Sequence, residues 1–127
     1  MKLAHIALWT KDVEQASAFW SEFFDAEIGE RYESRNRIGF VSRFVTLRGS
    51  GLKLELMQGP WVEMPAGLEH VGWAHIALTF GSREAVDVAA RRFELAGLLV
   101  SAARTTGDGY YEAVVNTPEG ILIEIVA

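Results

Sequence analysis

The stretch "AHIAL" occurs at residues 4–8 and again, letter for letter, at residues 74–78. An exact match in so short a chain is typical of an internal repeat. Each copy leads into a segment with apolar residues at helical spacing. These residues are Val13, Ala16, Phe19, Trp20 and Phe23 in the first half, and Val86, Ala89, Ala90, Phe93 and Ala96 in the second. Asp12 and Ser82 are suitable N-caps for the two helices, and Gly97 suits the end of the second.

Each half then continues in three short runs of strand-like pattern, at 26–33, 38–47 and 51–57 in the first half and at 98–104, 110–116 and 121–126 in the second. The turn signals "RGSG" and "TPEG" separate the last two runs of each half. Both halves therefore predict the order strand, helix, strand, strand, strand.

The predicted linker, residues 59–72, contains two prolines and three glycines. A half of about 60 residues has a marginal core by itself. We therefore expect one α+β domain over residues 1–127, built from two pseudo-symmetric βαβββ modules at about 1–58 and 73–127.

Composition excludes several classes of function. The 127 residues are 50% apolar and 23% charged, which is typical of a globular protein. The net charge of -5 argues against nucleic acid and anionic membranes as partners. The sequence has no cysteine, which excludes disulfides, thiolate catalysis and Cys-based metal sites. It has no apolar run of membrane-spanning length and no signal-peptide pattern, so we expect a cytoplasmic protein.

Strand alternation places a histidine and a glutamate together in each half. In the first strand, Ile6 and Leu8 suit the side covered by the helix, which leaves His5 on the opposite face. The last strands, "LKLEL" and "ILIEI", put Glu55 and Glu124 on that same opposite face. Each half thus offers one mid-strand His and one mid-strand Glu.

These four residues, His5, Glu55, His75 and Glu124, are candidate metal ligands. Taken singly, each glutamate is explained as the solvent-side residue of a half-exposed strand. Two matched copies instead favour a shared site, because a carboxylate among apolar residues is costly unless a cation compensates it. Two imidazoles and two carboxylates suit Zn, Ni, Co, Mn or Fe, and leave positions open for substrate. We expect no role for His70, in the predicted linker.

The hairpin turns predict which side chains surround this site. A tight turn at "RGSG" sets Phe44 opposite Glu55, and an equivalent turn at "TPEG" sets Ala113 opposite Glu124, with Tyr111 and Val115 on that face. The two curved sheets are then expected to form a cup lined by Trp9, Phe44, Trp73 and Tyr111, which suits a small organic ligand. Arg35, Asn36 and Arg37 in "ESRNRIG" would hold a substrate carboxylate, or else form a solvated loop.

At this point the sequence resembles the vicinal oxygen chelate superfamily, which includes glyoxalases, bleomycin-resistance proteins and extradiol dioxygenases. The resemblance covers nearly the whole chain and rests on the paired modules, on "HIAL" at the start of each, and on the closing "TPEGILIEIV". It implies two βαβββ modules around a metal, often in a homodimer with the site at a module or subunit interface. His5, Glu55, His75 and Glu124 match the four ligand positions, and the full set is most similar to bacterial glyoxalase I, the lactoylglutathione lyases.

This resemblance implies a metal-dependent lyase or isomerase. Its metal would be Ni, Co or Zn, with Mn or Fe as alternatives, and its substrate a hemithioacetal of glutathione or a similar 2-hydroxy carbonyl compound. A proton would move by way of a metal-stabilised enediolate, with Glu124 as base and Glu55 as second proton carrier. The same superfamily offers two alternatives, an extradiol-type dioxygenase with ferrous iron and one ligand fewer, and a metal-free drug-binding protein.

Overall fold

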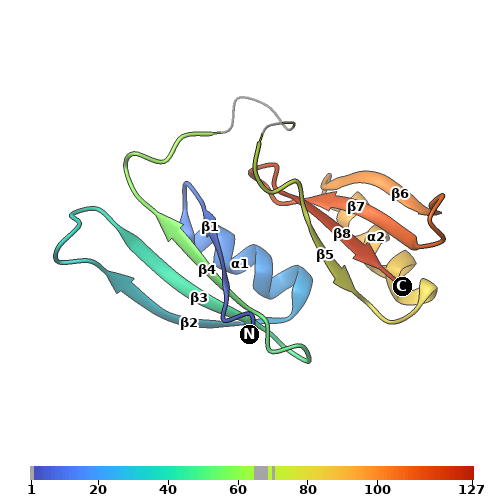
Figure 1. Ribbon diagram of the computed structural model, residues 1–127, viewed down its shortest axis with the longest axis horizontal. Coiled ribbons are helices and arrows are strands. Elements are labelled where there is room, and N and C mark those ends of the chain that lie inside the picture. Colours follow the sequence, from blue (N-terminus) through green and yellow to red (C-terminus); the bar gives the residue numbers. More distant parts are fainter. Residues whose placement is uncertain (1, 65–68, 70) are drawn as a thin grey trace. The chain divides into compact units, whose positions relative to one another are not determined.

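The structure, a computed structural model, describes residues 2–64, 69 and 71–127. The chain divides into two compact units, Met1–Met64 and Pro65–Ala127, and the division falls inside the predicted linker. Each unit contains a strand, a helix and three further strands (Figure 1). This confirms the predicted α+β fold of two βαβββ modules, while their union into one domain stays a prediction. His70 lies outside the described residues.

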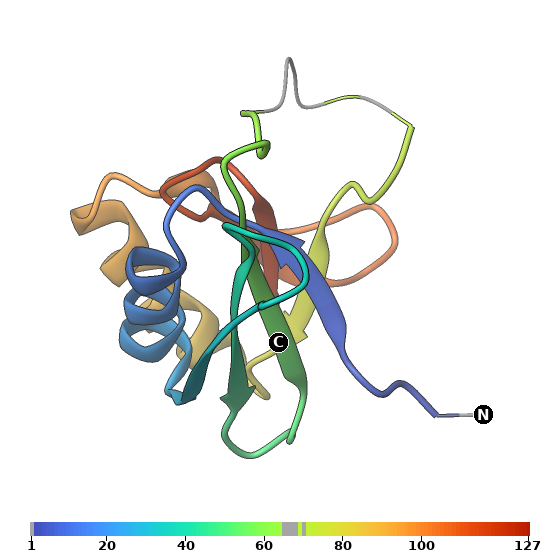
Figure 2. The same ribbon diagram turned by 90° about the vertical axis from the view of Figure 1, so that its left-hand side faces the viewer.

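Unit 1 consists of β1 (Ile6–Trp9), α1 (Val13–Phe24), β2 (Ala26–Glu33), β3 (Val41–Leu47) and β4 (Lys53–Gln58). Its sheet has the strand order β1-β4-β3-β2, in which β1 runs parallel to β4 and the other pairs are antiparallel. Helix α1 lies against one face of this sheet (Figure 2). The core between them contains Val13, Phe19, Trp20, Val45, Leu54 and Leu56.

Helix α1 begins and packs as the sequence predicts. The Asp12 carboxylate accepts hydrogen bonds from the backbone N–H groups of Glu14 and Gln15, at 2.9 and 3.1 Å, which satisfies two donors that the first turn leaves unpaired. Trp20 is only 1% exposed because the apolar stripe of the helix faces the sheet. The opposite face of the sheet is thereby left free of helix.

Unit 2 repeats this arrangement with β5 (Ile76–Thr79), α2 (Arg83–Leu95), β6 (Leu99–Thr105), β7 (Tyr111–Asn116) and β8 (Leu122–Val126). The strand order is β5-β8-β7-β6, again with the first strand parallel to the last. The Ser82 hydroxyl accepts from the N–H of Ala85 at 3.1 Å, and Gly97 follows the helix with φ +72°. The core contains Val86, Phe93, Val115, Ile123 and Ile125. Within the described part of the chain, neither helix is long and apolar enough to cross a membrane.

The register of the second hairpin differs from the prediction. In unit 1, Phe44 lies opposite Glu55 as predicted. In unit 2, Val114 lies opposite Glu124, and Ala113 pairs with Ile125 instead. The reason is loop length, because the Thr117 N–H bonds to the Ile121 carbonyl across three residues, whereas four residues separate the equivalent pair in unit 1. One residue fewer in the loop exchanges the two faces of β7.

Tyr111 therefore lies on the helix side of its sheet, and its predicted place in the substrate cup is wrong. Ala113 and Val115, which share its face, are buried at 1% and 0% exposure. The Tyr111 hydroxyl donates a hydrogen bond of 2.6 Å to Asp87 of α2, and the Arg83 guanidinium lies over the ring at 4.7 Å. Tyr111 thus links β7 to α2 by a hydrogen bond and a cation–π contact.

Phe93→Ala should lower the free energy of unfolding by about 3–5 kcal/mol, because it empties a fully buried aromatic site. Phe93 is 1% exposed, whereas Val88 on the same helix is 65% exposed. The matched control, Val88→Ala, should change stability by at most about 0.5 kcal/mol. Chemical denaturation of both variants measures the difference, and equal losses would contradict the assigned core.

Titration of the tyrosines tests the corrected register. The hydrogen bond to Asp87 raises the pKa of Tyr111 above its ordinary value. The stability that this bond contributes is present below the pKa of an unfolded tyrosine and is lost as pH rises through the raised folded value. Absorbance near 295 nm should show Tyr111 titrating at a higher pH than a tyrosine of the unfolded chain. Asp87→Asn should bring that transition to lower pH, and Tyr110→Phe should leave it in place.

Candidate functional site

His5 and Glu55 lie together on the face of the unit 1 sheet that points away from α1. Ala7 pairs with Glu55 in the parallel register of β1 and β4, and His5 Nε2 lies 3.6 Å from Glu55 Oε2. The two side chains are 43% and 21% exposed. The His5 ring meets Phe44 edge-on at a centroid separation of 5.4 Å. Phe44 thereby restricts the orientation of the imidazole beside the carboxylate.

Unit 2 builds the same pair from the same strand positions. Ala77 pairs with Glu124, and His75 Nε2 lies 3.2 Å from Glu124 Oε2. The side chains are 41% and 22% exposed, which matches the values in unit 1. Val114, opposite Glu124, takes the place that Phe44 has in unit 1. The two halves thus repeat the polar pair even where their apolar neighbours differ.

Both histidines lie one residue before a strand, where the sequence predicts mid-strand positions. β1 begins at Ile6 and β5 at Ile76. The partner strand β4 begins at Lys53, directly after its hairpin loop, so a longer β1 would have little backbone to pair with. Each histidine therefore has its backbone outside the strand and its side chain beside the glutamate.

The geometry of each pair suits two ligands of one divalent ion. Two donor atoms bonded at about 2.1 Å, at angles between octahedral and tetrahedral, lie about 3.0–3.4 Å apart. The observed separation is inside this range in unit 2, at 3.2 Å, and slightly above it in unit 1, at 3.6 Å. Among residues 2–64, 69 and 71–127, no three His, Asp or Glu side chains are grouped as a metal site. Each unit therefore offers one histidine and one glutamate as candidate ligands.

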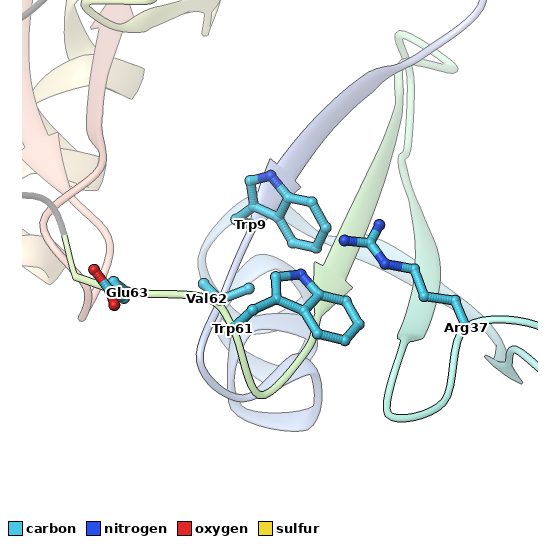
Figure 3. Close-up of a pocket in the computed structure, with 5 residues that line it drawn as sticks. All are labelled: Trp9, Arg37, Trp61, Val62 and Glu63. Atoms are coloured by element: carbon cyan, nitrogen blue, oxygen red, sulfur yellow. The ribbon is translucent and has the colours of Figure 1, made fainter.

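A pocket of about 270 Å³ lies within unit 1 and is lined by Trp9, Arg37, Trp61, Val62 and Glu63. Figure 3 shows the two indoles between the Arg37 guanidinium at one end and the Glu63 carboxylate at the other. Trp9 follows Ala7 by two residues on β1, so its side chain is on the same sheet face as His5 and Glu55. The Trp9 wall of the pocket therefore lies on the sheet face that carries His5 and Glu55.

The Trp61 wall depends on a glycine and on a lysine. A Cβ atom on Gly59 would lie 2.4 Å from the Trp61 ring, so only glycine leaves room for the indole in this position. The Lys11 ammonium donates a hydrogen bond of 2.6 Å to the Val62 carbonyl, which fastens the segment after β4 to the loop before α1. The Trp61 wall thus depends on the space beside Gly59 and on the hydrogen bond from Lys11.

The other predicted pocket residues are distributed differently. Arg35 and Asn36 are exposed on the loop between β2 and β3, whereas Arg37 from the same loop reaches the pocket. Trp73 is 87% exposed just before β5, and its place in the cup stays a prediction.

Sequence reasoning missed Trp61, Val62 and Glu63, which fall in the predicted linker. A tryptophan directly after "GP" was the available signal, because a large aromatic side chain is unusual in a solvated connection. It also missed Asn116, whose Oδ1 is buried and accepts no hydrogen bond from the described residues. By strand alternation Asn116 shares a sheet face with Glu124. Among the described residues, this oxygen is therefore an unpaired hydrogen-bond acceptor on the face that carries Glu124.

Comparisons with known proteins show the family to which this fold belongs. The profile of the Glyoxalase/Bleomycin resistance protein/Dioxygenase superfamily matches residues 2–125. A glyoxylase/bleomycin resistance protein/dioxygenase domain from Frankia sp. EAN1pec is 16% identical, with a TM-score of 0.85 over 99% of this chain and 96% of that one. A glyoxalase family protein from Enterococcus faecalis is 16% identical, with a TM-score of 0.80 over 99% and 97%.

A third similar structure is a mutant of the fosfomycin resistance protein FosX from Listeria monocytogenes, complexed with Mn(II) and 1S,2S-dihydroxypropylphosphonic acid. It is 24% identical, with a TM-score of 0.74 over 99% of this chain and 89% of that one. At these identities the structural likeness shows the fold alone. No curated protein sequence matches the chain.

Gly59→Ala should displace the Trp61 indole, because the added methyl group overlaps the ring. We expect the NMR signal of the Trp61 indole N–H to move, while that of Trp20, which is 1% exposed in the core, stays in place. Gly107→Ala is the control, since a Cβ there meets nothing within 4 Å. An unchanged Trp61 signal in Gly59→Ala would refute the described wall.

Proposed function

Because the chain belongs to the Glyoxalase/Bleomycin resistance protein/Dioxygenase superfamily, we propose that it is a metal-dependent lyase or isomerase of the glyoxalase I type. The observation that supports this proposal most is the repeated pair of His and Glu on the helix-free sheet faces of the two units. A drug-binding member without metal has no need of two such pairs.

His5, Glu55, His75 and Glu124 are the residues that would hold the metal. Their imidazole nitrogens and carboxylate oxygens are the donors that Zn, Ni, Co and Mn accept, with Fe as a further alternative. The separation inside each pair fits neighbouring ligands, and the Mn(II) complex of the similar FosX protein supports a divalent ion. When bound, such an ion supplies Lewis-acid polarisation of a substrate oxygen.

The two glutamates would move the proton. Glu124 and Glu55 are each about one-fifth exposed, so a substrate on the sheet face can reach them while much of each side chain stays out of water. We assign Glu124 as the base that takes a proton from the carbon beside a carbonyl group, and Glu55 as the second carrier that returns it. The neighbouring histidine orients each carboxylate and restricts it to the site.

The substrate we propose is the hemithioacetal that glutathione forms with methylglyoxal, or a similar 2-hydroxy carbonyl compound. Trp9 and Phe44 give the sheet face of unit 1 an apolar wall, at 43% and 39% exposure. Such a wall suits the carbon skeleton of a small organic substrate, which the polar pair then orients. Glutathione as co-substrate remains part of the proposal.

We propose a homodimer with the site at a module or subunit interface. The described residues of each unit offer one such His–Glu pair, so a four-ligand site would need two units, from one chain or from two. We propose that the enzyme acts in the cytoplasm, whose reducing conditions suit a sequence without cysteine.

Metal content of the untagged protein tests this function. We expect about one nickel, cobalt, zinc or manganese ion per four-ligand set by elemental analysis. His75→Ala and Glu124→Ala should lose the ion and the isomerisation of the methylglyoxal–glutathione hemithioacetal, with little loss of fold, because these side chains are partly exposed and not in the core.

His70→Ala is the matched control, because His70 is the one histidine of the sequence outside the two His–Glu pairs. This variant should leave both properties unchanged. Iron, with turnover of a catechol and oxygen, would replace the proposal by the dioxygenase alternative. Failure to bind any divalent ion would leave a small-molecule binding protein.

A further inference from the structure

The guanidinium of Arg37 makes cation–π contacts with three aromatic rings. Its Cζ lies 4.1 Å from the centroid of the Trp61 ring and 5.8 Å from those of Trp9 and Phe40. No salt bridge joins Arg37 to a carboxylate in the part of the chain that the structure describes. Stacking uses the flat face of a guanidinium and leaves its in-plane N–H groups free, so Arg37 keeps its donors for a ligand.

The ends of this pocket carry opposite charge. Arg37 and Glu63 lie at opposite ends, with Trp9 and Trp61 between them (Figure 3). A volume of about 270 Å³ is slightly below the roughly 300–1,000 Å³ of complete ligand sites, so the pocket fits one end of a substrate. An oxyanion is attracted to the Arg37 end and repelled from the Glu63 end. The pocket therefore fixes the direction in which a charged ligand enters.

Unit 2 lacks the equivalent parts, although it repeats the fold. Trp9 pairs with Met57 at the end of β1, and the corresponding position in unit 2 is Thr79, paired with Val126. The loop that corresponds to the Arg37 loop is the short turn at residues 106–110, closed by a hydrogen bond of 2.8 Å from the Thr106 N–H to the Tyr110 carbonyl. At these two positions the described residues of unit 2 thus differ from those that line the pocket of unit 1.

We propose that the pocket of Trp9, Arg37 and Trp61 is a substrate subsite for a flat, unsaturated group that carries one oxyanion. The flat group lies against the Trp9 indole, because Arg37 covers a face of Trp61, and the carboxylate or phosphonate accepts hydrogen bonds from the Arg37 guanidinium. Trp9 lies two residues beyond Ala7, so its backbone is about 7 Å along β1 from the position that pairs with Glu55. That the bound group is an end of the substrate rests on the proposed function.

A cationic ligand is the competing occupant, since two indoles and a carboxylate attract cations. Arg37 already covers the face of Trp61 at 4.1 Å, and a second cation there would be repelled by it. The charge already present in the pocket therefore selects an anion.

Titration with benzoate, phenylphosphonate and benzylammonium tests the subsite. The chain has four tryptophans, and their indole N–H signals are assigned with Trp→Phe variants. With EDTA present, benzoate or phenylphosphonate should shift the Trp9 and Trp61 signals and leave that of the buried Trp20 unchanged. The anion that binds more tightly shows whether the subsite prefers a carboxylate or a phosphonate. Tighter binding of benzylammonium, or no shift of Trp9 and Trp61 with either anion at 50-fold excess, would overturn the proposal.

Variants of the two neighbouring arginines assign the donor. Arg37→Leu should weaken benzoate binding about tenfold or more, and Arg37→Lys should also weaken it, because an ammonium lacks the planar fork. Arg35→Leu removes the same charge from the same loop and should change the affinity less than about twofold. An equal loss in Arg35→Leu would reduce the effect to general electrostatics and refute the subsite.

The metal measurement separates this proposal from the proposed function. Arg37→Leu should retain the metal content of the wild type. If the protein binds metal but benzoate shifts neither signal, the subsite proposal alone is refuted. If benzoate shifts the signals but no metal binds, the lyase proposal alone is refuted.

Discussion

The parallel pairing of the first and last strand in each unit is the constraint on which the site depends. Leu54 and Leu56 are buried under α1 at 0% and 1% exposure, and a slip of one residue would expose both and bury Glu55. The apolar core therefore fixes the register, and the register places Glu55 beside His5. The same holds in unit 2, where Ile123 and Ile125 flank Glu124. Packing of leucine and isoleucine thus positions the polar groups on the far face.

Most of this arrangement could be predicted from the sequence, because its signals are local or repeated. The caps, the helical stripes and the alternation in "LKLEL" and "ILIEI" each determine one element. The strand "YEAVVN" is different, since Ala113, Val114 and Val115 are consecutive apolar residues that fit either face. There the length of the loop at 118–120 decides, and that length depends on which residues form the closing hydrogen bond.

The pocket in unit 1 was only half predictable for a related reason. Trp9 is part of an alternating strand and Arg37 of a basic loop, and both attract notice by their chemistry. Trp61 comes to the pocket through contacts distant in sequence, such as the hydrogen bond from Lys11 that fastens the segment after β4. Likewise no local pattern distinguishes Arg37 from Arg35, since only the position of the Trp61 ring makes one of them a stacked cation.

The position of β1 and β5 at the edges of their sheets has a dynamic consequence. Within its own sheet each has a hydrogen-bonded neighbour on one side only, while β4 and β8 are paired on both sides. Edge strands of four residues open by local fluctuations at a lower free energy than central strands, and their amides exchange with solvent sooner. Each histidine thus precedes a strand of low protection, and each glutamate lies on a strand of high protection. In each pair the glutamate thus belongs to a central strand, and the histidine to backbone next to an edge strand that exchanges its amides sooner.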